Sequence, residues 1–121
     1  PQNALNKRNL LAYTYLRANM VDNARDELLS LIEEYNNYTA YRQLVYLEQG
    51  ENNLEDAKLW AYDALTKYPG SIQIREQIIS IAKMQRDNKE VLKQLKEIIS
   101  ISPENKRGNK MLDTIKRENE R

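Results

Sequence analysis

The residue types that most often carry enzymatic chemistry are missing, since the sequence contains no histidine and no cysteine. This removes the commonest general base, the usual activated nucleophiles and every imidazole or thiolate metal ligand. Carboxylate pairs could still exchange protons, and the candidates are Asp26-Glu27 and Glu33-Glu34. Each pair is adjacent in sequence, on an expected polar helix surface with Lys or Arg nearby, which is typical of solvated charges. We therefore predict no catalytic residue and no enzyme activity.

Acidic and amide residues are also concentrated between Glu51 and Asp56. This stretch lacks the central glycine and the ligand spacing of an EF-hand loop, so we interpret it as the start of a helix. The glycines stand alone at Gly50, Gly70 and Gly108, and none belongs to a phosphate-binding loop. We predict no metal site and no cofactor.

The composition is that of a folded chain without a strong charge. Of its 121 residues, 31% are charged and 40% are hydrophobic, and the net charge is +1. So balanced a charge gives no electrostatic basis for binding nucleic acid, and no apolar run approaches the roughly 18 residues of a membrane span. We expect neither nucleic-acid binding nor direct membrane insertion, and both cytoplasm and periplasm stay open as compartments. Because the chain begins at Pro1 without a Met, we expect it to be a fragment of a longer protein.

Helices are predicted almost throughout, because Gly and Pro are scarce and apolar residues recur every three or four positions. In the first helix this spacing places Leu10, Leu11 and Tyr15 on the apolar face. We expect Gly50 to cap the C-terminus of the third helix, and Asn53 to cap the N-terminus of the fourth through its side chain. The predicted helices span about 4–17, 23–35, 38–49, 53–68, 72–85, 89–101 and 105–119.

A repeat of 33 to 34 residues runs through these helices. Ala24 and Ala57 are 33 residues apart, Ala57 and Val91 are 34 apart, and Pro69 and Pro103 are also 34 apart. A period of this length is typical of helical hairpins that cannot bury their apolar faces alone and therefore stack on their neighbours.

The repeat resembles the tetratricopeptide repeat (TPR), whose pattern is W-x2-L-G-x2-Y, then A-x3-F, then P. The first hairpin resembles it at Arg8, Leu11, Ala12, Tyr15, Ala24 and Leu28, and the third at Arg75, Ile78, Ile79, Ala82, Val91, Leu95 and Pro103. The family's Trp is absent, and a larger residue replaces its Gly.

The second hairpin resembles the pattern less well. Ala57, Ala61 and Pro69 fit its second helix, but Tyr46 and Gly50 lie two residues too early relative to Ala57. A turn two residues longer between residues 50 and 53 would explain this offset, and the register of the first helix is otherwise left open.

The resemblance implies an all-α fold, an α-α superhelix (solenoid) of about three antiparallel hairpins plus a C-terminal capping helix. We expect one domain, 1–121, with repeats at about 5–37, 38–70 and 71–103 and a capping helix at 104–120. In the family the first helix of each hairpin lines a concave binding surface. The residues that the resemblance places there are Asn6, Asn9, Tyr13, Arg17, Gln73, Glu76 and Lys83. In the second hairpin, whose register is open, we choose Arg42 and Tyr46.

The functional hypothesis is a scaffold that binds another protein or peptide on this concave face. The overall character of the sequence favours a bacterial assembly, secretion or envelope system, although nothing identifies the partner. A structural spacer without a peptide ligand is one alternative, and a solenoid that forms homo-oligomers through its open ends is another. An RNA-binding helical repeat is disfavoured by the near-zero net charge.

Overall fold

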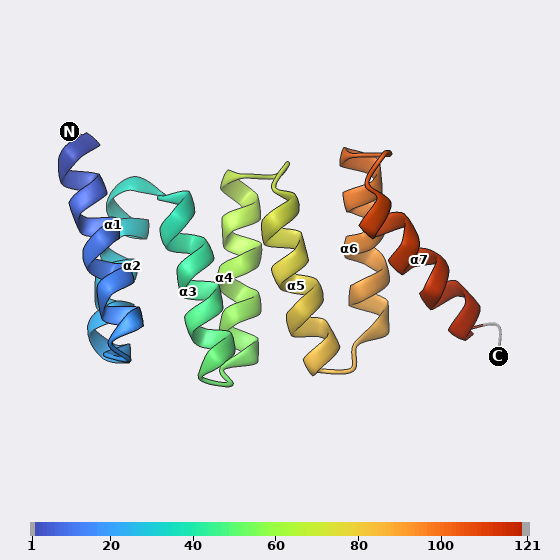
Figure 1. Cartoon of the computed structure of the whole chain (residues 1–121), viewed down its shortest axis with the longest axis horizontal. Coiled ribbons are helices and arrows are strands. Elements are labelled where there is room, and N and C mark those ends of the chain that lie inside the picture. Colours follow the sequence, from blue (N-terminus) through green and yellow to red (C-terminus); the bar gives the residue numbers. More distant parts are fainter. Residues whose placement is uncertain (1, 120–121) are drawn as a thin grey trace. The chain divides into compact units, whose positions relative to one another are not determined.

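The computed structural model describes residues 2–119, which form seven α-helices and no strand (Figure 1). The all-helical prediction is therefore confirmed. The helices are α1 (Gln2–Arg17), α2 (Val21–Tyr35), α3 (Tyr38–Gly50), α4 (Leu54–Lys67), α5 (Ile72–Met84), α6 (Asn88–Ile101) and α7 (Lys106–Asn119).

The chain divides into two compact units, Pro1–Pro69 and Gly70–Arg121. In the first unit α1 packs on α2 and α3 packs on α4, while α2 also packs on α3 and α1 touches α3. In the second unit α5 packs on α6, and α6 packs on α7. Each unit thus consists of consecutive helices that contact their neighbours in sequence, which is the arrangement expected of helical hairpins.

The core of the first unit combines small and large side chains. Ala24, Ala57, Ala61 and Ala64 are completely buried, and their size lets helix backbones approach closely. The space between the helices is filled by larger buried residues, namely Leu28, Leu31, Ile32, Tyr41, Leu44, Val45, Leu47 and Leu65.

The core of the second unit is a cluster between α5 and α6. It consists of Ile79, Ala82, Val91, Leu95 and Ile98, all at most 5% exposed. The partly buried side chains that pack against this cluster are Ile72, Met111 and Ile115. Two of these three belong to α7, so this helix covers apolar surface that α5 and α6 leave open.

The turn inside each hairpin has the same geometry. Asn19, Asn52 and Arg86 adopt left-handed backbone conformations, with φ of 57°, 61° and 57°. Each is flanked by equivalent backbone hydrogen bonds, such as Asn53 N to Glu48 O and Asp87 N to Ala82 O, both 2.8 Å. Residues 33 apart in the first two hairpins, and 34 apart in the second and third, are therefore structurally equivalent.

The longer turn expected in the second hairpin is therefore wrong, because the turn between α3 and α4 is as long as the turns between α1 and α2 and between α5 and α6. Tyr41 occupies the position of Arg8 and Arg75, and the buried Glu48 occupies the position of Tyr15. The family pattern does not have Tyr and Glu at these two positions, so the sequence did not show that α3 has the same register as α1 and α5.

Three local expectations are wrong. Gly50 is the last helical residue of α3 and has no positive φ, since Asn52 takes the left-handed conformation. Asn53 accepts no hydrogen bond from the first turn of α4. Leu10 and Leu11 are 64% and 41% exposed, because the buried side of α1 is centred on Ala12.

Two other residues at helix ends have the conformation or contact that the sequence predicts. The side chain of Asp87 accepts a hydrogen bond from the backbone amide of Glu90 at 3.1 Å, as its position before α6 predicts. Asn36, which follows α2, is left-handed with φ of 48°. Short polar side chains tolerate this conformation better than other residues do.

A polar contact ties the two helices of each hairpin, and its donor occupies the equivalent position on the first helix each time. In the first, Arg8 donates to Glu27 at 2.9 Å and to Glu34 at 2.8 Å, which raises the pKa of Arg8 above its usual range. In the second, the Tyr41 hydroxyl donates to Asp63 at 2.7 Å, and burial together with this bond raises the pKa of Tyr41. In the third, Arg75 donates to Gln94 at 2.9 Å.

A charge pair joins the first two hairpins. Arg25 on α2 donates from Nη2 to Oε1 of Glu48 on α3 at 2.7 Å, and the Glu48 side chain is only 7% exposed. This hydrogen bond lowers the pKa of Glu48, helped by a further bond from Asn53. The pair lies in the seam between hairpins, where an unpaired carboxylate would be strongly destabilising.

Candidate functional site

The first helix presents one open face with mixed chemistry. Asn6, Tyr13 and Arg17 follow helical spacing and are exposed, with Tyr13 at 48%. Leu10 lies on the same face and is 64% exposed. We refer to these four residues as the α1 face. It offers an aromatic ring, an aliphatic side chain, an amide and a cation to a ligand.

Asn9 departs from the expectation for this face. Its side chain is only partly exposed, and its Nδ2 donates to the backbone carbonyl of Leu5 at 3.0 Å. Its Oδ1 is buried and receives no hydrogen bond from any residue that the structure describes. Asn9 therefore lies beside the α1 face and does not form part of the open surface.

The third helix presents Arg42 and Tyr46, which are one helical turn apart. Both are exposed, and Tyr46 at 71% is the most exposed of the large hydrophobic residues. The helix register makes Tyr46 equivalent to Tyr13 and Arg42 equivalent to Asn9. Tyr46 also borders a cavity of about 220 Å³ at the turn ends of α1 and α3, lined further by Leu16, Asn19, Val21, Leu47, Gly50 and Glu51.

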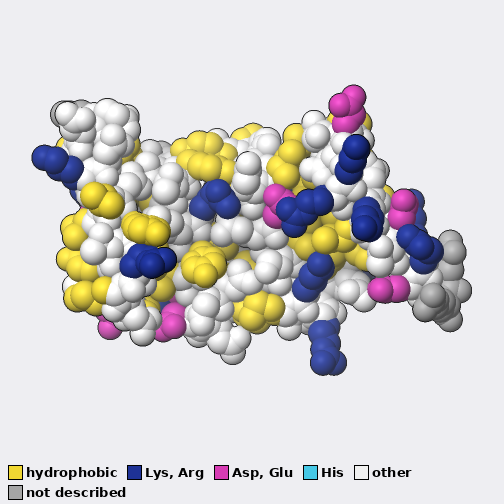
Figure 2. Space-filling model, in the orientation of Figure 1, with side chains coloured by type: hydrophobic (Ala, Val, Ile, Leu, Met, Phe, Trp, Pro, Cys, Tyr) yellow, Lys and Arg dark blue, Asp and Glu magenta, His cyan; other side chains and the backbone are white. Residues whose placement is uncertain are grey.

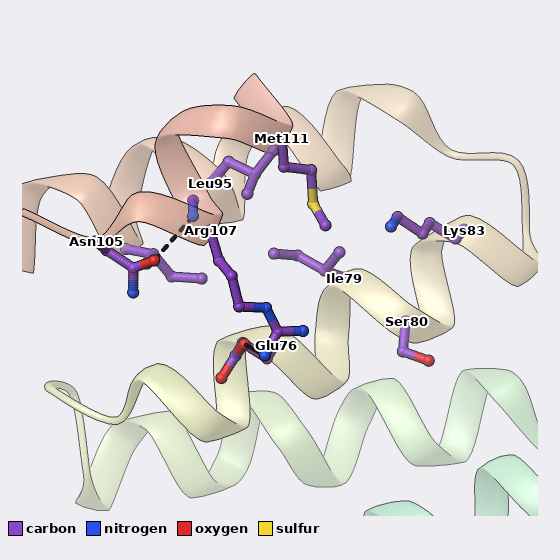
Figure 3. A pocket seen from close by; sticks show the side chains of 10 residues that line it. Glu76, Ile79, Ser80, Lys83, Leu95, Asn105, Arg107 and Met111 are labelled. Atoms are coloured by element: carbon purple, nitrogen blue, oxygen red, sulfur yellow. Dashed lines mark hydrogen bonds and ion pairs between the residues drawn. The ribbon is translucent and has the colours of Figure 1, made fainter. Parts of the chain in front are cut away.

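The fifth helix presents Gln73, Glu76 and Lys83, of which Glu76 and Lys83 border a cavity of about 180 Å³ within the second unit. Figure 3 shows the Met111 side chain pointing towards Ile79, both of which line this cavity, with Arg107 reaching from α7 towards Glu76. Gln73 is exposed but does not border it. We refer to this cavity as the α5–α7 pocket, and its remaining lining residues are Ser80, Leu95, Ile98, Asn105 and Gly108.

The structure thus groups the predicted residues into three sets, on α1, α3 and α5. Sequence reasoning missed Leu10, because it was assigned to the core, and Arg107, because α7 was considered only as a cap. The exposure of Leu10 could have been predicted from its spacing, because residues three or four positions apart, such as Asn6, Leu10, Tyr13 and Arg17, share a helix face. No pattern in the sequence signals that α7 lines a pocket with α5.

Within residues 2–119, no group of three or more acidic residues is placed to hold a metal ion. None of the helices described here is long and apolar enough to cross a membrane.

Comparisons with known proteins give structural similarity alone. No protein-family model matches the sequence, and no curated protein matches it. Solved structures do match. An alternative dimer of the type III secretion translocator chaperone SycD from Yersinia enterocolitica has a TM-score of 0.82 at 12% identity, covering 98% of this chain and 96% of that one.

Two further structures are similar. PcrH from Pseudomonas aeruginosa has a TM-score of 0.80 at 11% identity and covers 96% of this chain and 94% of its own. The TPR domain of Arabidopsis OM64 has a TM-score of 0.74 at 11% identity and covers 95% and 96%. At these identities the likeness shows a fold, and the fold that it shows is the TPR-like helical hairpin array.

Proposed function

We propose that this chain, whose fold is TPR-like, is a protein-interaction module that binds another protein through the exposed faces of its first helices, α1 and α3 in the first unit and α5 in the second. The observation that carries the proposal is the pair of equivalent tyrosines. Tyr13 and Tyr46 are 48% and 71% exposed, on helices whose opposite faces are buried. Large aromatic side chains with a polar tip are enriched among residues that dominate binding energy.

Cations and amides accompany these rings. Arg17 lies one turn from Tyr13 on α1, and Arg42 lies one turn from Tyr46 on α3. Arginine is also enriched at binding hot spots, since its planar guanidinium both stacks and donates several hydrogen bonds. Mixed surfaces of this kind suit an extended or helical peptide with its own side chains better than a ligand of one charge sign.

A role in a bacterial secretion or assembly system is part of the proposal. Its support is that one of the similar structures is a secretion translocator chaperone, although a shared fold does not by itself transfer a function. The experiment therefore addresses the binding face first and identifies the partner afterwards.

The test is site-specific photocrosslinking in cells of the source organism that produce this protein. A photoreactive phenylalanine analogue replaces Tyr46 in one variant and Leu59 in another. Leu59 is the matched control, because it is 67% exposed but belongs to α4, the second helix of the same hairpin. We expect a discrete product of higher mass from position 46 and none from position 59.

Substitutions then verify the face. The double variant Tyr13→Ala/Arg17→Ala should weaken capture of the crosslinked partner while its helical circular dichroism stays unchanged, since both side chains are exposed. Crosslinking from position 59 alone would place the site on the second helices and contradict the proposal. A product of twice the chain mass would instead support the self-associating alternative.

A further inference from the structure

The α5–α7 pocket has an apolar interior. Ile79, Leu95 and Ile98 belong to the buried cluster of the second unit, and Met111 closes the pocket from α7. An apolar cavity of about 150 Å³ inside a protein is large enough to hold benzene. At about 180 Å³, this pocket is therefore large enough for one leucine, methionine or phenylalanine side chain.

The rim of the pocket is charged. Lys83 is exposed and forms no ion pair with any residue from 2 to 119, while Arg107 is 85% exposed and lies 3.6 Å from a carboxylate oxygen of Glu76. So long and exposed an ion pair contributes little, because solvent screens it. Both cations are thus available to an incoming carboxylate, and Figure 3 shows them on different sides of the pocket.

The surrounding surface is basic although the whole chain is nearly neutral. Residues 70–121 contain twelve Lys or Arg and eight Asp or Glu, whereas residues 1–69 contain seven and ten. Net charges of +4 and −3 follow. Figure 2 shows Lys and Arg side chains around an exposed apolar patch over α5–α7. A ligand for this pocket should therefore be acidic around its apolar group.

From this charge complementarity and the apolar interior, we propose that the α5–α7 pocket receives an apolar side chain of a partner polypeptide that has acidic residues next to it. This inference rests on the proposed function and specifies the segment that the partner must contain. The apolar side chain enters the pocket beside Ile79 and Met111, and the neighbouring carboxylates face Lys83 and Arg107.

Glu76 limits the preference for an acidic ligand in this arrangement. Its carboxylate lies beside Arg107 and competes with a ligand carboxylate for the same guanidinium. It also repels an acidic ligand at short range. Removing its charge should therefore favour an acidic ligand and disfavour a basic one.

The test uses three blocked tripeptides as probes: acetyl-Glu-Leu-Glu-amide, acetyl-Lys-Leu-Lys-amide and acetyl-Glu-Ser-Glu-amide. Each is titrated to millimolar concentration into the isotope-labelled full chain, and binding is followed by NMR. The first probe should shift the methyl signals of Ile79 and Met111 and the amide signal of Gly108. The other two should bind more weakly, because one lacks complementary charge and the other lacks the apolar group.

Variants of exposed residues complete the test without disturbing the core. Lys83→Glu should weaken binding of the Glu-Leu-Glu probe by at least about threefold, because it removes one exposed charge contact and adds a repulsive charge. Lys96→Glu is the control, since this exposed lysine lies outside the pocket and its substitution should leave binding unchanged. Glu76→Gln should strengthen binding of the same probe.

Equal binding of the Lys and Glu probes, shifts located elsewhere, or no shift at all would overturn the inference. The outcome is separable from that of the proposed function. If position 46 crosslinks a partner while the probes do not bind, only the pocket assignment is wrong. If the probes bind as expected and position 46 crosslinks nothing, the binding role of α1 and α3 is wrong while the pocket stands.

Discussion

At the scale of single residues, the molecule depends on polar groups placed in its seams. Glu48 is 5% exposed, and its carboxylate is held by Arg25 from the preceding hairpin. The sequence shows both residues, but neither their pairing nor the burial of Glu48 follows from helical periodicity. Glu48 stands where the family pattern has an aromatic residue, so reasoning by resemblance could not assign it either.

The pair makes stability dependent on pH with a definite sign. Arg25 lowers the pKa of Glu48 in the folded chain below its ordinary value of 4.5. The unfolded chain therefore binds the proton more tightly, and the stabilisation is complete above about pH 4.5 and is lost as the pH falls through the lower folded value. Glu48→Gln removes the charge but keeps the size of the side chain.

We expect Glu48→Gln to reduce the free energy of unfolding by about 2 kcal/mol at pH 7, as for a lost hydrogen bond to a charged group. The difference from the parent should shrink as the pH is lowered to 3. Urea unfolding at both pH values measures it. Glu33→Gln is the control, because Glu33 is exposed on α2 and its substitution should have little effect. A difference that is independent of pH would contradict the ion-pair explanation.

At the scale of helices and turns, the three hairpins share one turn geometry with different residues at its centre. Asparagine occupies the left-handed position in the first two, whereas arginine occupies it in the third with φ of 57°. A side chain with a Cβ atom is unfavourable there unless it is short and polar. The third turn is therefore the least favourable of the three.

Arg86→Gly should stabilise the chain relative to Arg86→Ala by about 0.5–1 kcal/mol, because only glycine relieves the left-handed conformation. The comparison with alanine cancels the loss of the arginine side chain, which is exposed. Thermal and urea unfolding of both variants measure the difference. Equal stability of the two would mean that the turn carries no strain.

The helices themselves could be predicted because their periodicity, prolines and turn residues all agree. The helix ends could be predicted to within a few residues, and the exposed position of Tyr13 and Arg17 followed from the resemblance. The register of α3 could not be predicted, because it follows only from the shared geometry of the three turns. Nor could the α5–α7 pocket, since the packing of Met111 depends on how α7 lies against α6.

At the scale of the molecule, α7 completes the second unit. Met111 and Ile115 pack against the buried cluster formed by α5 and α6. The other side of α7 is strongly charged and exposed. α7 thus covers apolar surface of the α5–α6 pair and turns a polar surface to solvent.

Met111→Ser/Ile115→Ser should weaken this packing by about 2–4 kcal/mol, because two partly buried apolar side chains are lost. The exposed cluster should then cause the chain to associate. Light scattering after size-exclusion chromatography measures the association, and Asp113→Ser/Thr114→Ser on the exposed side of the same helix is the control. A monomeric chain with the stability of the parent would show that α7 is dispensable for solubility.

The bond between Arg25 and Glu48 also determines the order in which the hairpins can follow one another. The positions equivalent to Arg25 in the second and third hairpins are Lys58 and Leu92. A chain rearranged so that the third hairpin preceded the second would bring Leu92 to the place of Arg25, and Glu48 would be buried without a cation. Loss of one partner of a buried pair costs about 3–5 kcal/mol, a large share of the stability of a small domain. The backbone period would permit any permutation or duplication of the hairpins. The Glu48 carboxylate, however, requires a preceding hairpin with a positive charge at the position of Arg25.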